Sequence, residues 1–74
     1  MEPKAEGYFK QGIDLLRTIG NETELAKGLE SYGRYKIEQG QIPEGRQLLM
    51  QCLEIYQRLG LRQTDEVKGI LASL

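Results

Sequence analysis

Three glycines divide the chain at equal intervals: Gly20, Gly40 and Gly60. Each follows a stretch in which apolar residues recur with helical spacing. Helices commonly end at a residue with positive φ, which glycine adopts without the steric clash that a Cβ atom would cause. The spacing therefore predicts a chain of short helices, each ended by a glycine and joined to the next by a tight turn.

The residues that follow these glycines are typical of helix starts. Asn21 and Glu24 have the spacing of a capping box, Pro43 suits a first helical turn, and Thr64 is a candidate N-cap. Short connections make consecutive helices antiparallel neighbours. We therefore expect one all-α domain of antiparallel helical hairpins, with helices at about 4–19, 22–39, 43–59 and 64–73.

The apolar pattern of the first expected helix returns forty residues later. The first helix carries Ala5, Phe9, Gly12, Leu16 and Ile19, and the third carries Gly45, Leu49, Cys52, Tyr56 and Leu59. Steps of four and three keep each set on one helical face, so both stripes are expected to be buried. A repeating helical hairpin is the simplest explanation of this periodicity.

Glycines inside the expected helices need an explanation, because each costs about 1 kcal/mol relative to alanine. Gly12, Gly33 and Gly45 fall on the expected buried faces, and we expect them to let neighbouring helices approach closely. A merely weak helix is the alternative. Most of the tyrosines are expected to be buried or partly buried: Tyr8, Tyr32, Tyr35 and Tyr56.

Composition argues against several classes of function. The net charge is -1, with ten basic and eleven acidic residues, and this balance favours neither nucleic acid nor an anionic membrane. No apolar run approaches the length of about 20 residues that spans a bilayer. The chain has no histidine and one cysteine, Cys52, so we expect no metal, no cofactor, no catalytic residue and a reducing, cytoplasmic setting. Cys52 itself is expected to fill a small packing position.

The stretch from Ala26 to Leu53 resembles the tetratricopeptide repeat (TPR). The matching positions are Leu29 in the first large apolar position, Tyr32-Gly33 in the Leu-Gly position, Gly40 in the turn, Gly45 in the small position, Leu49 in the aromatic position and Cys52-Leu53 in the Ala-Leu position. Lys36 departs from the pattern, because the family usually has a buried tyrosine there. The period of about forty is similar to the longer repeats of bacterial signalling ATPases and transcriptional regulators. The resemblance implies a short right-handed solenoid, which can also be part of a longer array.

The resemblance also implies a function. TPR domains bind peptides in the groove lined by the first helix of each hairpin, which here would present Lys27, Glu30, Arg34, Ile37 and Glu38. We therefore expect a module that binds a protein or peptide partner through this concave face. Two alternatives remain open: these residues form a solvated charged face, or the chain is a structural element that stacks on other repeats or on a copy of itself.

Overall fold

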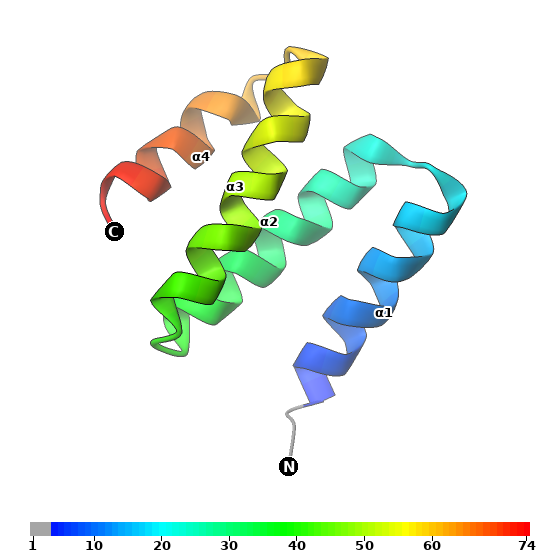
Figure 1. The fold of residues 1–74 in the computed structure, drawn as a ribbon, viewed down its shortest axis with the longest axis horizontal. Coiled ribbons are helices and arrows are strands. Elements are labelled where there is room, and N and C mark those ends of the chain that lie inside the picture. Colours follow the sequence, from blue (N-terminus) through cyan, green and yellow to red (C-terminus); the bar gives the residue numbers. More distant parts are fainter. Residues whose placement is uncertain (1–3) are drawn as a thin grey trace.

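The computed structural model describes residues 4–74, which form four helices: α1 (Lys4–Ile19), α2 (Glu22–Glu38), α3 (Ile42–Leu59) and α4 (Gln63–Ala72). Each helix reverses the direction of the one before it and packs against it, with the most extensive contact between α2 and α3 (Figure 1). The expected all-α fold class is confirmed. Every helix begins and ends within one residue of the predicted position.

The three glycine turns share one geometry. Gly20, Gly40 and Gly60 have φ angles of 75°, 81° and 67°, and among residues 4–74 no other residue has a positive φ. In each turn the residue after the glycine donates its backbone N–H to a carbonyl five residues earlier, at 2.9–3.1 Å. The glycine N–H donates to the carbonyl three residues earlier, at 3.0–3.3 Å. This pair of bonds is the Schellman motif, which satisfies carbonyls that the helix end would leave without a partner.

The predicted helix starts are only partly right. The Asn21 side chain accepts the Glu24 backbone N–H at 3.2 Å, as the capping box requires, but the Glu24 carboxylate binds Lys27 instead of reaching back. The Thr64 cap is wrong, because α4 begins at Gln63 and has no side-chain cap. The first backbone N–H groups of α4 donate to backbone carbonyls instead. For example, the Thr64 N–H donates to the Leu61 carbonyl oxygen at 3.2 Å.

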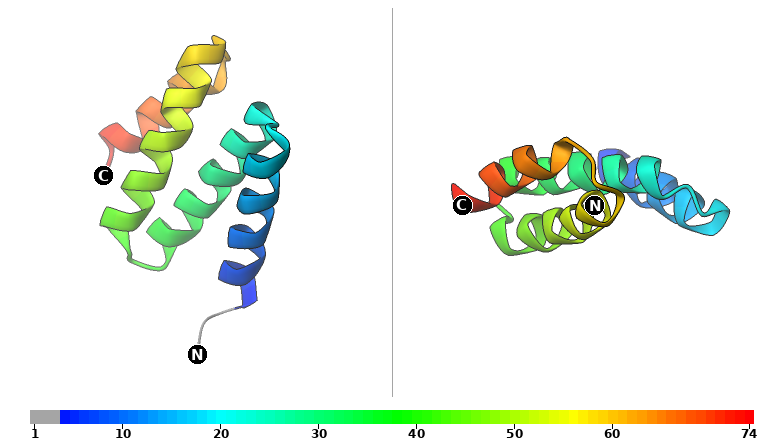
Figure 2. Two further views of the ribbon diagram at one scale, coloured as in Figure 1. Left: turned by 45° about the vertical axis from the view of Figure 1, so that its right-hand side comes forward. Right: turned by 90° about the horizontal axis from the view of Figure 1, so that it is seen from above.

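The helices form a slab whose principal extents are 38, 32 and 13 Å, and its thin edge is seen from above in Figure 2. Most of the core comes from α2 and α3. The buried apolar residues are Ile13, Ala26, Leu29, Tyr32, Leu49, Cys52, Ile55, Tyr56 and Val67. The slab therefore has a single core, which α2 and α3 share, and the packing between these two helices stabilises the fold most.

The closest contact between α2 and α3 is made by two glycines. A Cβ atom on Gly33 would lie 2.9 Å from Leu49 Cγ, and one on Gly45 would lie 2.8 Å from the Gly33 carbonyl oxygen and 2.6 Å from Ile37 Cγ1. The close-packing role predicted for these two residues is therefore confirmed. The same prediction for Gly12 is wrong, since nothing lies within 4 Å of the Cβ position there.

The predicted stripe of α3 is buried except at its last residue, whereas that of α1 is not. Ala5, Gly12 and Ile19 are exposed, and α1 instead buries Glu6 and Ile13. Among residues 4–74, α1 packs mainly on α2, and the face that it buries there lies next to the predicted face. Phe9 and Leu16 lie between these two faces and are half-buried.

Candidate partner-binding surfaces

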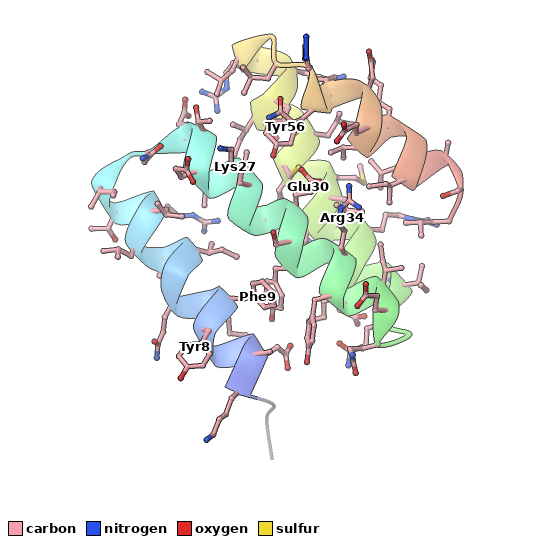
Figure 3. All side chains as sticks on the ribbon, turned by 180° about the vertical axis from the view of Figure 1, so that it is seen from behind. Tyr8, Phe9, Lys27, Glu30, Arg34 and Tyr56 are labelled. Carbon is pink, nitrogen blue, oxygen red and sulfur yellow. The ribbon has the colours of Figure 1, made fainter. Side chains whose placement is uncertain are left out.

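The residues predicted to bind a partner all lie on α2, and Figure 3 shows three of them: Lys27, Glu30 and Arg34. The Lys27 ammonium lies 3.3 Å from the Glu24 carboxylate, and Arg34 Nη2 lies 2.8 Å from Glu30 Oε2. The Lys27 and Arg34 side chains remain 52% and 49% exposed. Each cation is therefore held by a carboxylate one helical turn away while about half of it stays open to solvent.

Glu30 has a second role that links this surface to the core. Its Oε1 atom accepts a hydrogen bond from the Tyr56 hydroxyl at 3.0 Å, and its side chain is only 16% exposed. Burial and the bond to Glu30 raise the pKa of Tyr56, so the phenol stays protonated and remains the donor. Glu30 thus ties α2 to α3 and fixes the position of Arg34.

The last two predicted residues differ from each other. Ile37 is half-buried and packs over Gly45, so it belongs to the contact between α2 and α3. Glu38 is exposed at the end of α2. The structure therefore leaves Lys27, Arg34 and Glu38 exposed along the helix, and we call these three residues the α2 row.

Two adjoining hollows lie on another side of α2: the larger between α1 and α3, and the smaller between α2 and α3. The larger has a volume of about 330 Å³ and is lined by Lys10, Ile13, Asp14, Arg17, Leu29, Tyr32, Leu48 and Gln51. The smaller, of about 250 Å³, shares Tyr32, Leu48 and Gln51 with it. No residue of the α2 row lines either hollow, so the two surfaces are separate.

A polar cluster between α1 and α2 was not expected from the sequence. Glu6 forms an ion pair with Lys36 and accepts a hydrogen bond from the Tyr32 hydroxyl at 2.9 Å. Phe9 stacks on the Tyr32 ring, with 5.2 Å between centroids, and the Lys36 ammonium lies 5.4 Å from the centre of that ring. Hydrogen bonds from Lys36 and Tyr32 lower the pKa of Glu6, and the bond to Glu6 raises the pKa of Lys36. The one sequence signal was Lys36, which stands where the tetratricopeptide repeat, the family that the chain resembles, usually has a buried tyrosine.

An apolar surface is left open on the outer side of α1. Tyr8 is 72% exposed, and Leu15 and Ile19 are each 61% exposed. The other three tyrosines are buried or partly buried, so the prediction that most of the tyrosines are buried is confirmed. Figure 3 shows Tyr8 pointing away from the body of the molecule, whereas Phe9 points toward α2. We call Ala5, Tyr8, Gly12, Leu15 and Ile19 the outer stripe of α1.

The described residues bring together little reactive chemistry. No three His, Cys, Asp or Glu side chains within residues 4–74 are placed to hold a metal ion. Cys52 is fully buried, and its burial raises the pKa of the thiol to about 12. In the part of the chain that the structure describes, no helix has both the length and the apolar character needed to cross a membrane. No protein-family model, curated protein or solved structure matches the chain.

Proposed function

We propose that the chain is a TPR-like interaction module that binds a protein or peptide partner along α2 in the cytoplasm, without a cofactor or a catalytic step. The observation that carries the proposal is the α2 row. Lys27 and Arg34 lie seven residues apart, two turns along one face, and each is ordered by a neighbouring carboxylate while half of its side chain stays exposed. Charges fixed before binding lose less conformational entropy when a partner arrives.

The arrangement of charge favours a partner of mixed charge. Two cations are followed by the Glu38 carboxylate at the end of α2. A peptide that places two carboxylates about 10 Å apart would meet Lys27 and Arg34 together, since seven helical residues rise by about that distance. A basic residue next to these carboxylates would meet Glu38.

Selection of peptides from a displayed random library tests this proposal. Enriched peptides are titrated against the wild-type chain, the Lys27→Glu and Arg34→Glu double variant, and a Lys10→Glu and Arg17→Glu double variant. The second pair is also seven residues apart but lies on α1, beside the larger hollow. We expect the first pair to raise Kd by about tenfold or more, equivalent to about 1.4 kcal/mol, and the second to leave it unchanged. The opposite ranking would move the binding site to the hollow.

Self-association is the second candidate function, and the outer stripe of α1 favours it. Exposed apolar side chains that lie side by side on one helix face are typical of a surface that another chain covers. A helix at the end of a repeat array has such a face unless a neighbour or a polar cap covers it.

A further inference from the structure

The outer stripe of α1 has the geometry of a helix-binding face. Its five residues follow steps of three and four, which keeps them on one side of the helix. The three large members are among the most exposed apolar side chains of the described residues. At Gly12 nothing within residues 4–74 occupies the Cβ position, so the backbone itself is open there.

The forty-residue repeat indicates what this face is built to contact. Ala5 and Gly12 correspond to Gly45 and Cys52 of α3. In α3 those two positions are buried, and the Cβ position of Gly45 lies within 3.2 Å of α2 atoms. At these two positions α3 packs against other helices, whereas α1 leaves the corresponding positions exposed.

We propose that two copies of this chain form a dimer through their outer stripes, with the two α1 helices antiparallel and the twofold axis at Gly12. This proposal rests on self-association, the second candidate function above, and specifies the surface and the partner, which is a second copy of the chain. Tyr8 and Leu15 lie four and three residues from Gly12 on opposite sides, and Ala5 and Ile19 each lie seven residues away. An antiparallel pairing centred on Gly12 therefore places Tyr8 against the second copy's Leu15, and Ala5 against the second copy's Ile19.

Size and charge both favour this register. Gly12 meets Gly12 at the axis and each Ile19 meets the small Ala5, so the helices can approach closely at these positions, while Tyr8 and Leu15 supply contacts between large side chains. The stripe itself carries no charged residue. Lys4, at the start of α1, comes to lie beside the C-terminal end of the second α1, where the helix dipole attracts a cation. The two Lys4 residues are far apart, because a helix of 16 residues is about 24 Å long.

Sedimentation equilibrium from micromolar to millimolar protein tests the dimer. Contact through one helix face is smaller than the roughly 1,200 Å² of a stable interface, so we expect weak, concentration-dependent dimerisation. Leu15→Glu with Ile19→Glu should weaken it by about tenfold or more, because a carboxylate would be buried against apolar atoms. Met50→Glu is the matched control, since Met50 is 57% exposed on α3 and should leave dimerisation unchanged. A monomer at every concentration overturns the inference, and so does a dimer that tolerates the double variant.

Cysteine cross-linking tests the register separately. Under mild oxidation Gly12→Cys should form a disulfide-linked dimer readily, because the two positions meet on the axis, whereas Ile19→Cys should not. The native Cys52 is buried and will not compete. Equal cross-linking of both variants would contradict the antiparallel pairing. Failure of the peptide selection, by contrast, would affect only the α2 row and leave this result intact.

Discussion

The Glu6 carboxylate and the Lys36 ammonium form an ion pair between α1 and α2, and their side chains are only 11% and 13% exposed. The same carboxylate accepts the Tyr32 hydroxyl at 2.9 Å. Lys36 also donates to the side-chain oxygen of Gln41 at 2.8 Å. Each charge is therefore satisfied by several partners, which is the condition under which a poorly hydrated ion pair stabilises a fold.

Glu6→Gln should lower the melting temperature at neutral pH, because it leaves the Lys36 ammonium without its counter-charge. The folded pKa of Glu6 is lowered, so the pair stabilises the fold above the unfolded value of about 4.3, and this contribution is lost as pH falls through the folded pKa. The folded pKa of Lys36 is raised, so the contribution is complete below about 10.4 and is lost as pH rises through its folded pKa. The difference in melting temperature between wild type and Glu6→Gln should thus be largest between these two pH values and should disappear in acid. Thermal unfolding at a series of pH values measures this difference. Glu54→Gln is the control, because Glu54 is an exposed carboxylate on α3. A difference in melting temperature that does not depend on pH would show that loss of the ion pair is not its cause.

Substitutions of two helical glycines by alanine should have opposite effects. Gly45→Ala places a Cβ atom 2.8 Å from the Gly33 carbonyl oxygen, so α2 and α3 must separate, at a cost of about 1–3 kcal/mol. Gly69→Ala meets nothing within 4 Å, so the better helix propensity of alanine should stabilise α4 by up to about 1 kcal/mol. Denaturant midpoints compare the two, and equal effects would mean that close approach at Gly45 does not limit stability.

Gly40→Val should destabilise the turn between α2 and α3 through the backbone alone. The φ angle there is 81° and a Cβ atom would meet nothing within 4 Å, so steric crowding by neighbours plays no part. A residue with a side chain in this conformation costs roughly 1–2 kcal/mol, and a β-branched one costs more. Asparagine tolerates positive φ, so Gly40→Asn is the control and should melt above the valine variant. Similar melting temperatures for the two variants would contradict this explanation.

Cys52 should react with thiol reagents only when the protein opens. The side chain is fully buried and its pKa of about 12 keeps the thiol protonated at pH 8, whereas the reactive species is the thiolate. Labelling in native buffer should therefore be far slower than in denaturant and should accelerate in destabilised variants such as Gly45→Ala. Rapid labelling of the native protein would show that Cys52 is reached without unfolding.

The helix boundaries could be predicted because their signals are local. Gly20, Gly40 and Gly60 end their helices for a conformational reason that depends on no distant residue. The α3 stripe could also be predicted, since Gly45, Leu49 and Cys52 have one consistent buried face.

The buried face of α1 could not be chosen from periodicity. Apolar residues occupy two overlapping faces of this helix, one through Ile13 and one through Leu15, and only the position of α2 decides between them. Glu6 was unpredictable for a related reason. A carboxylate is expected at the surface, and its burial depends on Lys36, which lies thirty residues further along the chain.

The most direct test of a partner-binding α2 is to map bound peptide by backbone amide chemical shifts. Isotope-labelled protein is titrated with a peptide from the display selection. We expect the largest shifts along α2 from Lys27 to Glu38, with small changes at the α1 and α3 residues that line the larger hollow. Largest shifts at Lys10, Arg17 and Gln51 instead would contradict the proposal and place the partner in that hollow.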